Sequence, residues 1–251
     1  MKCPKCGIRQ EDGNVECVRC GLIFSRYKPP EDRNLPRNCH GKEVSRTGRV
    51  ISYLFHTGDR VEPVYLLGRA MVFTLVAIWS ISFLGSSIEG NYAGRSFMHL
   101  VNLPFHEAGH VIFRPFGSLL HSLGGSLGQL IMPLVCTGVL LVKTRDPFGA
   151  SIALWWTGES ILDMAPYIND ALPMRLQLLG GNTGASAPYG FHDWNYILSE
   201  LDLLREHETI ARLAEAGGKT VMVIALLWGM AVLVRQALRL RASSPPSGAS
   251  R

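Results

Sequence analysis

The sequence predicts a mainly α-helical membrane protein, a polytopic bundle of about four to five apolar segments preceded by a small cysteine-rich unit. Hydrophobic residues make up 47% of the chain and concentrate in two stretches, Val64–Leu172 and Val221–Val234. The first sixty residues and the stretch 180–219 are polar instead. Such an uneven distribution is typical of a chain that crosses a bilayer several times and carries soluble appendages.

The net charge of +5 raises the question of a nucleic-acid partner, but the distribution of the cations argues against one. Lysine and arginine scatter through the expected linker, the short loops and the C-terminus, without a surface of interleaved basic and aromatic residues. Cations that flank apolar segments set the orientation of a membrane protein. We therefore expect membrane lipid as a partner and no nucleic acid. The polar N-terminus also predicts no cleavable signal peptide.

Residues 1–27 contain two nearly identical Cys-x-x-Cys-Gly motifs. Each motif turns two thiolates toward one point, so four thiolates complete a tetrahedral Zn²⁺ site with no open position. A segment this short buries little core, and the metal must therefore supply its folding energy. We predict a structural zinc site formed by Cys3, Cys6, Cys17 and Cys20. The segment resembles the small zinc ribbons at the N-termini of many bacterial proteins.

The zinc ribbon also predicts where the N-terminus lies. Thiolates that bind zinc must stay reduced, which places this end of the chain in the cytoplasm. Cys39 and Cys136 are isolated in the sequence, and no disulfide framework is expected. Because a closed site has no room for chemistry, we expect the ribbon to bind a protein partner or a substrate.

The rest of the chain divides into a linker, a membrane domain and a tail. Residues 28–63 are rich in proline, arginine and lysine and form the linker or juxtamembrane segment, and residues 64–241 form the membrane domain. Its expected apolar segments are Tyr65–Leu84, Ser96–Pro115, Ser118–Val142, Phe148–Tyr167 and Thr220–Leu238. A polar insertion, 173–219, contains an expected amphipathic helix over Ile197–Ala216. The Ser/Pro/Gly-rich tail, 242–251, is expected to be disordered.

Ser118–Val142 is the least regular of the apolar segments. The G-x-x-x-G spacing of Gly124 and Gly128 permits close helix contact, whereas the same glycines together with Pro133 also fit a re-entrant hairpin. Four spans plus a re-entrant element would place Lys143 and the C-terminal arginines on the cytoplasmic side, together with Arg145. This arrangement satisfies the positive-inside rule, and we therefore prefer it.

One H-E-x-x-H motif lies within the second apolar segment. On a helix, His106 and His110 lie one turn apart on the same face, where both can bind one Zn²⁺. Glu107 then lies beside the open position of the metal and can take a proton from a zinc-bound water and later return it. Three polar side chains in a bilayer segment each need a partner. The sequence thus predicts a catalytic zinc bound by His106 and His110, with Glu107 as the general base.

A catalytic zinc needs a third protein ligand. The metzincin extension H-E-x-x-H-x-x-G-x-x-H is excluded, because Phe113 and Phe116 stand where its Gly and its third His belong. The residues alone leave several candidates open: Glu159, Asp163, Asp170, His192 and Asp193. The His192–Asp193 pair fits equally well a group that orients a ligand, a substrate contact or the capped start of a helix.

An H-E-x-x-H on a membrane helix, followed by a later membrane segment with Pro and then Asp, resembles the site-2 protease group of intramembrane zinc metalloproteases. The second motif of that family is approximately N-x-x-P-x-x-x-x-D-G, and its Asp is the third zinc ligand. In the segment 163–171, Pro166 matches and Asp170 stands one residue early, while Asp163 and Ala171 replace the Asn and the Gly. The resemblance covers 96–171 and favours Asp170 as the third ligand, followed by Asp163; His192 is the alternative outside the matched segment.

The resemblance further implies hydrolysis of peptide bonds in a membrane-protein or peptide substrate, within the bacterial inner membrane. Two other functions fit the same residues. One is a proteolytically inactive membrane protein that keeps its zinc for structure or sensing. The other is a regulator in which the apolar spans only anchor the zinc ribbon.

Overall fold

The computed structural model describes residues 1–27, 46–57, 61–179, 181–186 and 192–243. The chain divides into two compact units, Met1–Val44 and Ser45–Arg251. Helices dominate the second unit, and the ranges just given contain only isolated β-bridges and no strand. The predicted mainly α-helical class is thus confirmed. Most of the expected linker, with Cys39, and the tail beyond Ser243 lie outside the described residues.

Two turns with the same backbone geometry, followed by a short 3-10 helix at Phe24–Arg26, form the described part of the first unit. The N–H of Cys3 donates to the carbonyl of Ile8, and the N–H of Cys17 donates to the carbonyl of Leu22, both at 2.9 Å. Each motif ends in a glycine with positive φ, 73° at Gly7 and 67° at Gly21, a conformation that side chains disfavour. The sequence duplication therefore corresponds to a duplicated fold.

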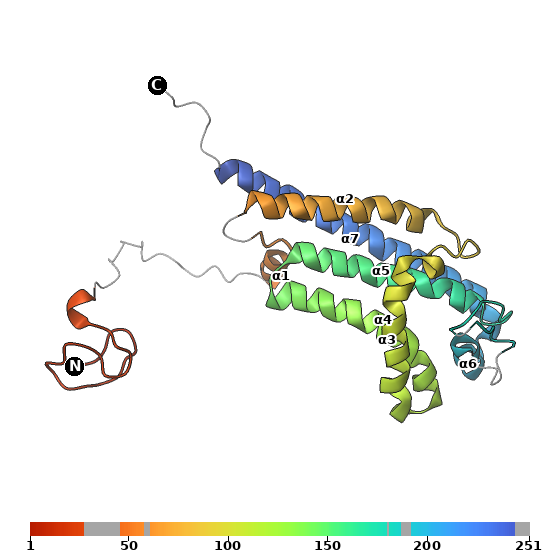
Figure 1. Cartoon of the computed structure of the whole chain (residues 1–251), viewed down its shortest axis with the longest axis horizontal. Helices are drawn as coiled ribbons and strands as arrows, with labels where there is room; N and C mark the ends of the chain where they lie inside the picture. The colour runs from red at the N-terminus through yellow and green to blue at the C-terminus, as the bar shows by residue number, and fades with distance from the viewer. Residues whose placement is uncertain (28–45, 58–60, 180, 187–191, 244–251) are drawn as a thin grey trace, which may run out of the picture. The chain divides into compact units, whose positions relative to one another are not determined.

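The described residues of the second unit form seven α-helices. Their bounds are α1 Arg46–Leu54, α2 Pro63–Gly85, α3 Phe97–Phe113, α4 Ser118–Gly138, α5 Pro147–Asn169, α6 Asp193–Glu200 and α7 His207–Ser243. In Figure 1, α2, α5 and α7 run along nearly the same direction, whereas α3 lies across them. The short helix α1 falls within the segment that the sequence assigned to the linker.

Helix α5 forms the centre of this unit, and most of its residues are buried. It packs most extensively on α7, where two glycines allow the backbones to touch. A Cβ on Gly158 would lie 2.7 Å from the nitrogen of Met222, and a Cβ on Gly218 would lie 2.7 Å from the oxygen of Gly158. Because α5 is surrounded by protein, its polar side chains can be satisfied by neighbouring helices.

Three helices are long and apolar enough to cross a membrane: α2, α4 with its π-helical continuation Val139–Lys143, and α7 with the turn that precedes it. This supports the expected membrane character of the protein. Of the other two expected segments, α3 is only 17 residues long, and α5 carries Glu159 and Asp163. The structure therefore has fewer clear candidates than the four to five apolar segments that the sequence predicts.

The preferred re-entrant hairpin at Ser118–Val142 is absent, because α4 is one continuous helix through Gly138. Its glycines bring α4 against α3 instead of breaking the helix. A Cβ on Gly128 would lie 2.1 Å from the oxygen of Phe105, and a Cβ on Gly124 would lie 2.6 Å from the oxygen of Gly109. A glycine weakens a helix by only about 1 kcal/mol relative to alanine, which close packing outweighs.

The expected amphipathic helix over Ile197–Ala216 is interrupted. Helix α6 ends at Glu200, and a 3-10 turn at Leu204–Glu206 precedes α7. Asp202 between them has a φ of 56°, which a regular helix does not allow. Beyond this break, α7 continues without interruption from the polar insertion into the predicted last span.

Candidate metal centres

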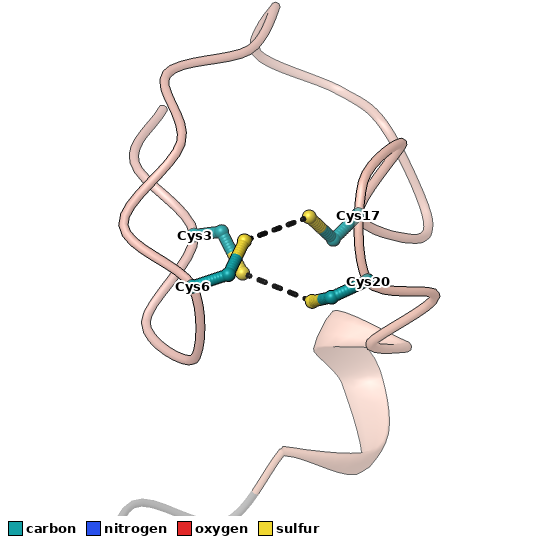
Figure 2. A group of neighbouring side chains, drawn as sticks. All are labelled: Cys3, Cys6, Cys17 and Cys20. Carbon is teal, nitrogen blue, oxygen red and sulfur yellow. Dashed lines mark hydrogen bonds between the residues drawn. The ribbon is translucent and has the colours of Figure 1, made fainter. Parts of the chain in front are cut away.

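The four N-terminal cysteines converge as the spacing predicts (Figure 2). The Sγ atoms of Cys3 and Cys20 lie 3.8 Å apart, and those of Cys6 and Cys17 lie 3.6 Å apart. Two sulfurs that each lie about 2.3 Å from a tetrahedral zinc are about 3.8 Å apart, so these distances fit a shared metal. All four thiols are free, and two of them are buried. The geometry is compatible with a small, closed zinc-binding site.

A second group lies where α3, α4 and α6 meet. Helix α3 places the rings of His106 and His110 side by side, with centroids 4.9 Å apart. The Oδ2 atom of Asp193 lies 3.6 Å from Nε2 of His106 and 3.3 Å from Nε2 of His110. Ligand atoms about 2.0–2.1 Å from one tetrahedral zinc are separated by about 3.3 Å. These three residues could therefore hold one metal ion.

Asp170 is not part of this group. Its Oδ1 accepts a hydrogen bond from the N–H of Arg175 at 2.8 Å, and its Oδ2 accepts one from the N–H of Leu176 at 2.9 Å. The carboxylate thus fixes the loop after α5, and Oδ2 also lies 3.4 Å from Nε2 of His192. Asp193 occupies the position that the resemblance assigned to Asp170.

The two alternatives to Asp170 are also engaged elsewhere. Asp163 lies beside Nδ1 of His99, with 3.0 Å between that nitrogen and Oδ1. The Nδ1 atom of His192 accepts a hydrogen bond from the N–H of Asn195 and caps the first turn of α6. That cap fixes the start of the helix at Asp193. His192 and Asp193 therefore have different roles: His192 caps α6, and Asp193 faces His106 and His110.

Two features indicate that the space between these side chains suits a metal ion. Gly125 on α4 faces both imidazoles, and a Cβ there would lie 2.4 Å from Nε2 of His106 and 2.6 Å from Nε2 of His110. Any side chain at this position would occupy the point on which both nitrogens converge. In addition, the buried Oδ1 of Asp193 has no hydrogen-bond partner among the described residues. A buried oxygen of this kind needs a cation or a proton donor.

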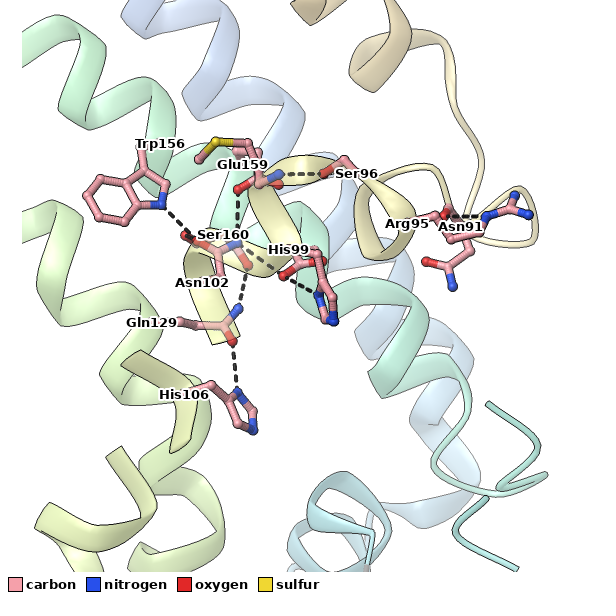
Figure 3. Close-up of polar contacts among 12 residues, drawn as sticks. Asn91, Arg95, Ser96, His99, Asn102, His106, Gln129, Trp156, Glu159 and Ser160 are labelled. Carbon is pink, nitrogen blue, oxygen red and sulfur yellow. Dashed lines mark hydrogen bonds and ion pairs between the residues drawn. The ribbon is translucent and has the colours of Figure 1, made fainter. Parts of the chain in front are cut away.

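Both histidines are oriented by their other ring nitrogen. Nδ1 of His106 lies 2.8 Å from Oε1 of Gln129 (Figure 3), and the amide of Gln129 donates through Nε2 to the carbonyl of Ser160. The amide orientation leaves Oε1 as the acceptor, so Nδ1–H of His106 is the donor. Nδ1 of His110 likewise donates to the carbonyl of His121 at 2.8 Å. With Nδ1–H engaged in this way, each ring can present Nε2 to a metal ion, as ligation requires.

Replacing Gln129 with leucine should weaken metal binding at this site by roughly 10–100-fold, because the ring of His106 loses the acceptor that orients it. Titration with a competing chelator measures the change in affinity. Gln236→Leu, which removes another buried amide far along α7, is the matched control and should leave the affinity unchanged. Equal losses in the two variants would contradict an orienting role of Gln129.

The acidic residues of α5 belong to a separate buried network (Figure 3). Asn102 donates through Nδ2 to Oε2 of Glu159 at 2.9 Å and to Oδ2 of Asp163 at 3.1 Å. Its Oδ1 accepts hydrogen bonds from the indole of Trp156 and the hydroxyl of Ser160. Glu159, fully buried, is therefore bound to α3 through an amide and is not a metal ligand in this arrangement.

A cavity of about 970 Å³ opens along α3 and contains the candidate site. Glu107 lines this cavity together with the two histidines and Asp193, and Leu103 adds to its apolar wall. Burial raises the pKa of the Asp193 carboxyl, but the imidazoles of His106 and His110 outweigh that effect and lower it to about 2. Asp193 is thus ionised, as a ligand must be.

Three residues that shape the site were not predicted from the sequence. Gln129 and Gly125 lie on α4, and Tyr167 on α5 donates its hydroxyl to Oδ2 of Asp193 at 3.3 Å. The doubled glycine before a polar Gln in an otherwise apolar segment was the only sequence signal for the first two. Nothing in the sequence around Tyr167 distinguishes it from a packing residue.

No protein-family model, curated protein or solved structure matches this chain.

Proposed function

We propose that the protein is a membrane-embedded zinc metalloprotease that hydrolyses peptide bonds in membrane-protein or peptide substrates. The observation that supports this most is the convergence of His106, His110 and Asp193 beside Glu107 in one cavity. Two histidines and one carboxylate leave a coordination position for water, which distinguishes catalytic from structural zinc sites. Two features support the likeness to the site-2 protease group: the H-E-x-x-H motif and the set of two histidines and one aspartate. The aspartate, Asp193, lies outside the segment that resembles the second motif of that family.

Within this proposal each residue has one role. Bound zinc would polarise the scissile carbonyl and lower the pKa of its water. Glu107 would act as the general base for the attacking water and as the general acid for the leaving amine. Gln129 and the carbonyl of His121 hold the two imidazoles in the metal-binding tautomer. Glu107 is exposed and lines the same cavity, so a substrate in the cavity could reach it.

The membrane arrangement is part of the same proposal. Helices α2, α4 and α7 cross the bilayer, α5 passes between them as a fourth crossing, and α3 is an oblique element at one end. Lys143 and Arg145, between α4 and α5, lie at the opposite end, with the last turn of α7. By the positive-inside rule this basic end faces the cytoplasm of a bacterial inner membrane. The N-terminus is then cytoplasmic, and the metal cavity opens toward the other side.

The N-terminal unit is proposed to bind zinc and to recognise a protein partner or a substrate. Its four thiolates close the metal completely, so the ion can stabilise the fold but cannot activate water. Among the described side chains of this unit, Val15 and Val18 are the most exposed apolar ones, at 73% and 72%. They offer a contact surface that the fold itself does not use.

Replacing Glu107 with glutamine tests the proposal. The variant should bind as much zinc as the wild type but cleave a transmembrane test substrate at least 100-fold more slowly, because the general base is lost. Cleavage is measured by gel and mass spectrometry with purified protein in nanodiscs. Glu200→Gln, at an exposed glutamate of α6, is the matched control and should cleave normally. Full zinc content without cleavage by the wild type would instead support an inactive zinc-binding membrane protein.

A further inference from the structure

The end of the helical unit away from the metal cavity gathers exposed cationic side chains. Lys143 and Arg145 lie in the connection between α4 and α5, and Arg235, Arg239 and Arg241 lie in the last turns of α7. Helix α5 runs from this end toward α6, and α7 runs back in the opposite direction (Figure 1). We call these five residues the basic end.

The nearest acidic side chain does not neutralise the basic end, because it has another partner. Asp146 pairs with Arg69 of α2 at 3.1 Å, and both side chains are about one-third exposed, 30% and 33%. The guanidinium of Arg69 also lies over the ring of Phe148, 5.7 Å from its centroid. Glu62, exposed before the start of α2, is the other acidic residue in the described chain near this end. Among the described residues, the five cations at this end therefore outnumber the acidic residues near it.

Two of the cations are held in place by aromatic rings. The guanidinium of Arg145 lies 4.8 Å from the ring centroid of Tyr53, and that of Arg235 lies 4.2 Å from the centroid of Phe55. The indole of Trp228 donates to the carbonyl of Leu54 and ties this segment to α7. Arg145 also donates through Nη2 to the hydroxyl of Tyr53 at 3.4 Å. A guanidinium that an aromatic ring holds in place loses less freedom when its remaining N–H groups bind phosphate oxygens. Tyr53 and Phe55 lie two residues apart in the chain, so one short segment holds both Arg145 and Arg235.

The basic end borders directly on apolar surface. Val64 and Leu67 at the start of α2 are 80% and 63% exposed, and Leu238 in the last turns of α7 is 58% exposed. In a bilayer, the boundary between apolar surface and clustered arginines coincides with the headgroup phosphates. A nucleic acid would need a wider polar surface around the cations, and the exposed apolar side chains beside them limit that surface.

We infer that Arg145 and Arg235, seated on Tyr53 and Phe55, form a binding site for the headgroup phosphate of an anionic phospholipid. Lys143 and the last arginines of α7 attract the lipid to the site and add to its affinity. The inference rests on the membrane-crossing part of the proposed function and does not depend on hydrolysis. Zinc content and peptide cleavage are measured separately, so failure of one proposal is distinguishable from failure of the other.

The test compares lipid binding to the purified full-length protein by native mass spectrometry and by thermal melting. Phosphatidylglycerol should bind and raise the melting temperature, whereas phosphatidylcholine should not. The double variant Arg145→Gln/Arg235→Gln should bind phosphatidylglycerol roughly 20-fold more weakly, because each lost cation removes about a fivefold gain. The control Arg175→Gln/Arg205→Gln carries the same charge change at the cavity end and should bind as the wild type does.

Several outcomes would overturn the inference. Equal binding of the two lipids would mean that the headgroup charge is not recognised. Unchanged binding in the double variant, with its zinc content and helical circular dichroism intact, would mean that the site lies elsewhere. Glycerol 3-phosphate binding as tightly as the lipid would identify a free-phosphate site, and preference for a short RNA would identify a nucleic-acid surface. As a second variant, Tyr53→Leu should weaken binding while keeping every charge.

Discussion

Replacing Gly125 with alanine should leave the protein with one zinc ion per chain instead of two, since only one of the two candidate sites is changed. The added Cβ would lie 2.4 Å and 2.6 Å from the Nε2 atoms of His106 and His110. If the rings stay, the methyl group occupies the metal position; if they rotate away, the ligands no longer converge. Peptide cleavage should be lost with the metal. Inductively coupled plasma mass spectrometry gives the metal-to-protein ratio.

The matched control is Gly138→Ala on the same helix, where a Cβ would meet nothing within 4 Å. Alanine favours a helix by about 1 kcal/mol relative to glycine. Neither substitution should therefore destabilise α4 through its helix propensity. Gly138→Ala should keep two zinc ions and normal cleavage. Two zinc ions in Gly125→Ala would contradict a metal position between these histidines.

Replacing Asp193 with alanine should likewise remove the metal from the cavity site. Its carboxylate is the only one among the described residues within ligand distance of both histidines. Loss of a direct ligand should reduce zinc affinity by more than the roughly 10–100-fold typical of a residue that only orients a ligand. The metal-to-protein ratio of the purified variant, together with a chelator titration, measures both effects.

Asp170→Asn and Asp163→Asn are the comparison variants, because they change the two aspartates of the imperfect second motif. Both should keep two zinc ions. Asp170→Asn should instead destabilise the loop after α5, where Asp170 accepts hydrogen bonds from the N–H groups of Arg175 and Leu176. Its melting temperature should fall while the metal ratio holds. Loss of one zinc in Asp170→Asn but not in Asp193→Ala would restore the expectation drawn from the family resemblance.

Local sequence was sufficient wherever the ligands are close neighbours along the chain. The two Cys-x-x-Cys turns predict four converging thiols, and the thiols do converge in a group. The i and i+4 spacing predicts that His106 and His110 share a helix face, and their rings lie side by side. In both cases the geometry follows from one turn or one helix, which the backbone fixes without help from distant residues.

The sequence did not predict the correct contact where a residue could interact with more than one partner. Asp170 and Asp193 have the same chemistry, and only the loop after α5 decides that the first accepts backbone N–H groups while the second faces the histidines. The re-entrant hairpin was wrong for a related reason. A glycine can end a helix or admit a neighbouring backbone, and the presence of α3 beside α4 decided between the two.

The sequence by itself determined the cysteine cluster, the histidine pair with its glutamate, and the apolar character of the long helices. Only the tertiary structure identified Asp193 as the third residue of the cavity site. It alone also showed the space that Gly125 leaves between the two histidines and the orientation of His106 by Gln129. These features join α3, α4 and α6, which are distant along the chain. Side-chain types and spacings do not encode such contacts; they arise only when the helices pack and each polar group takes the partner within its reach.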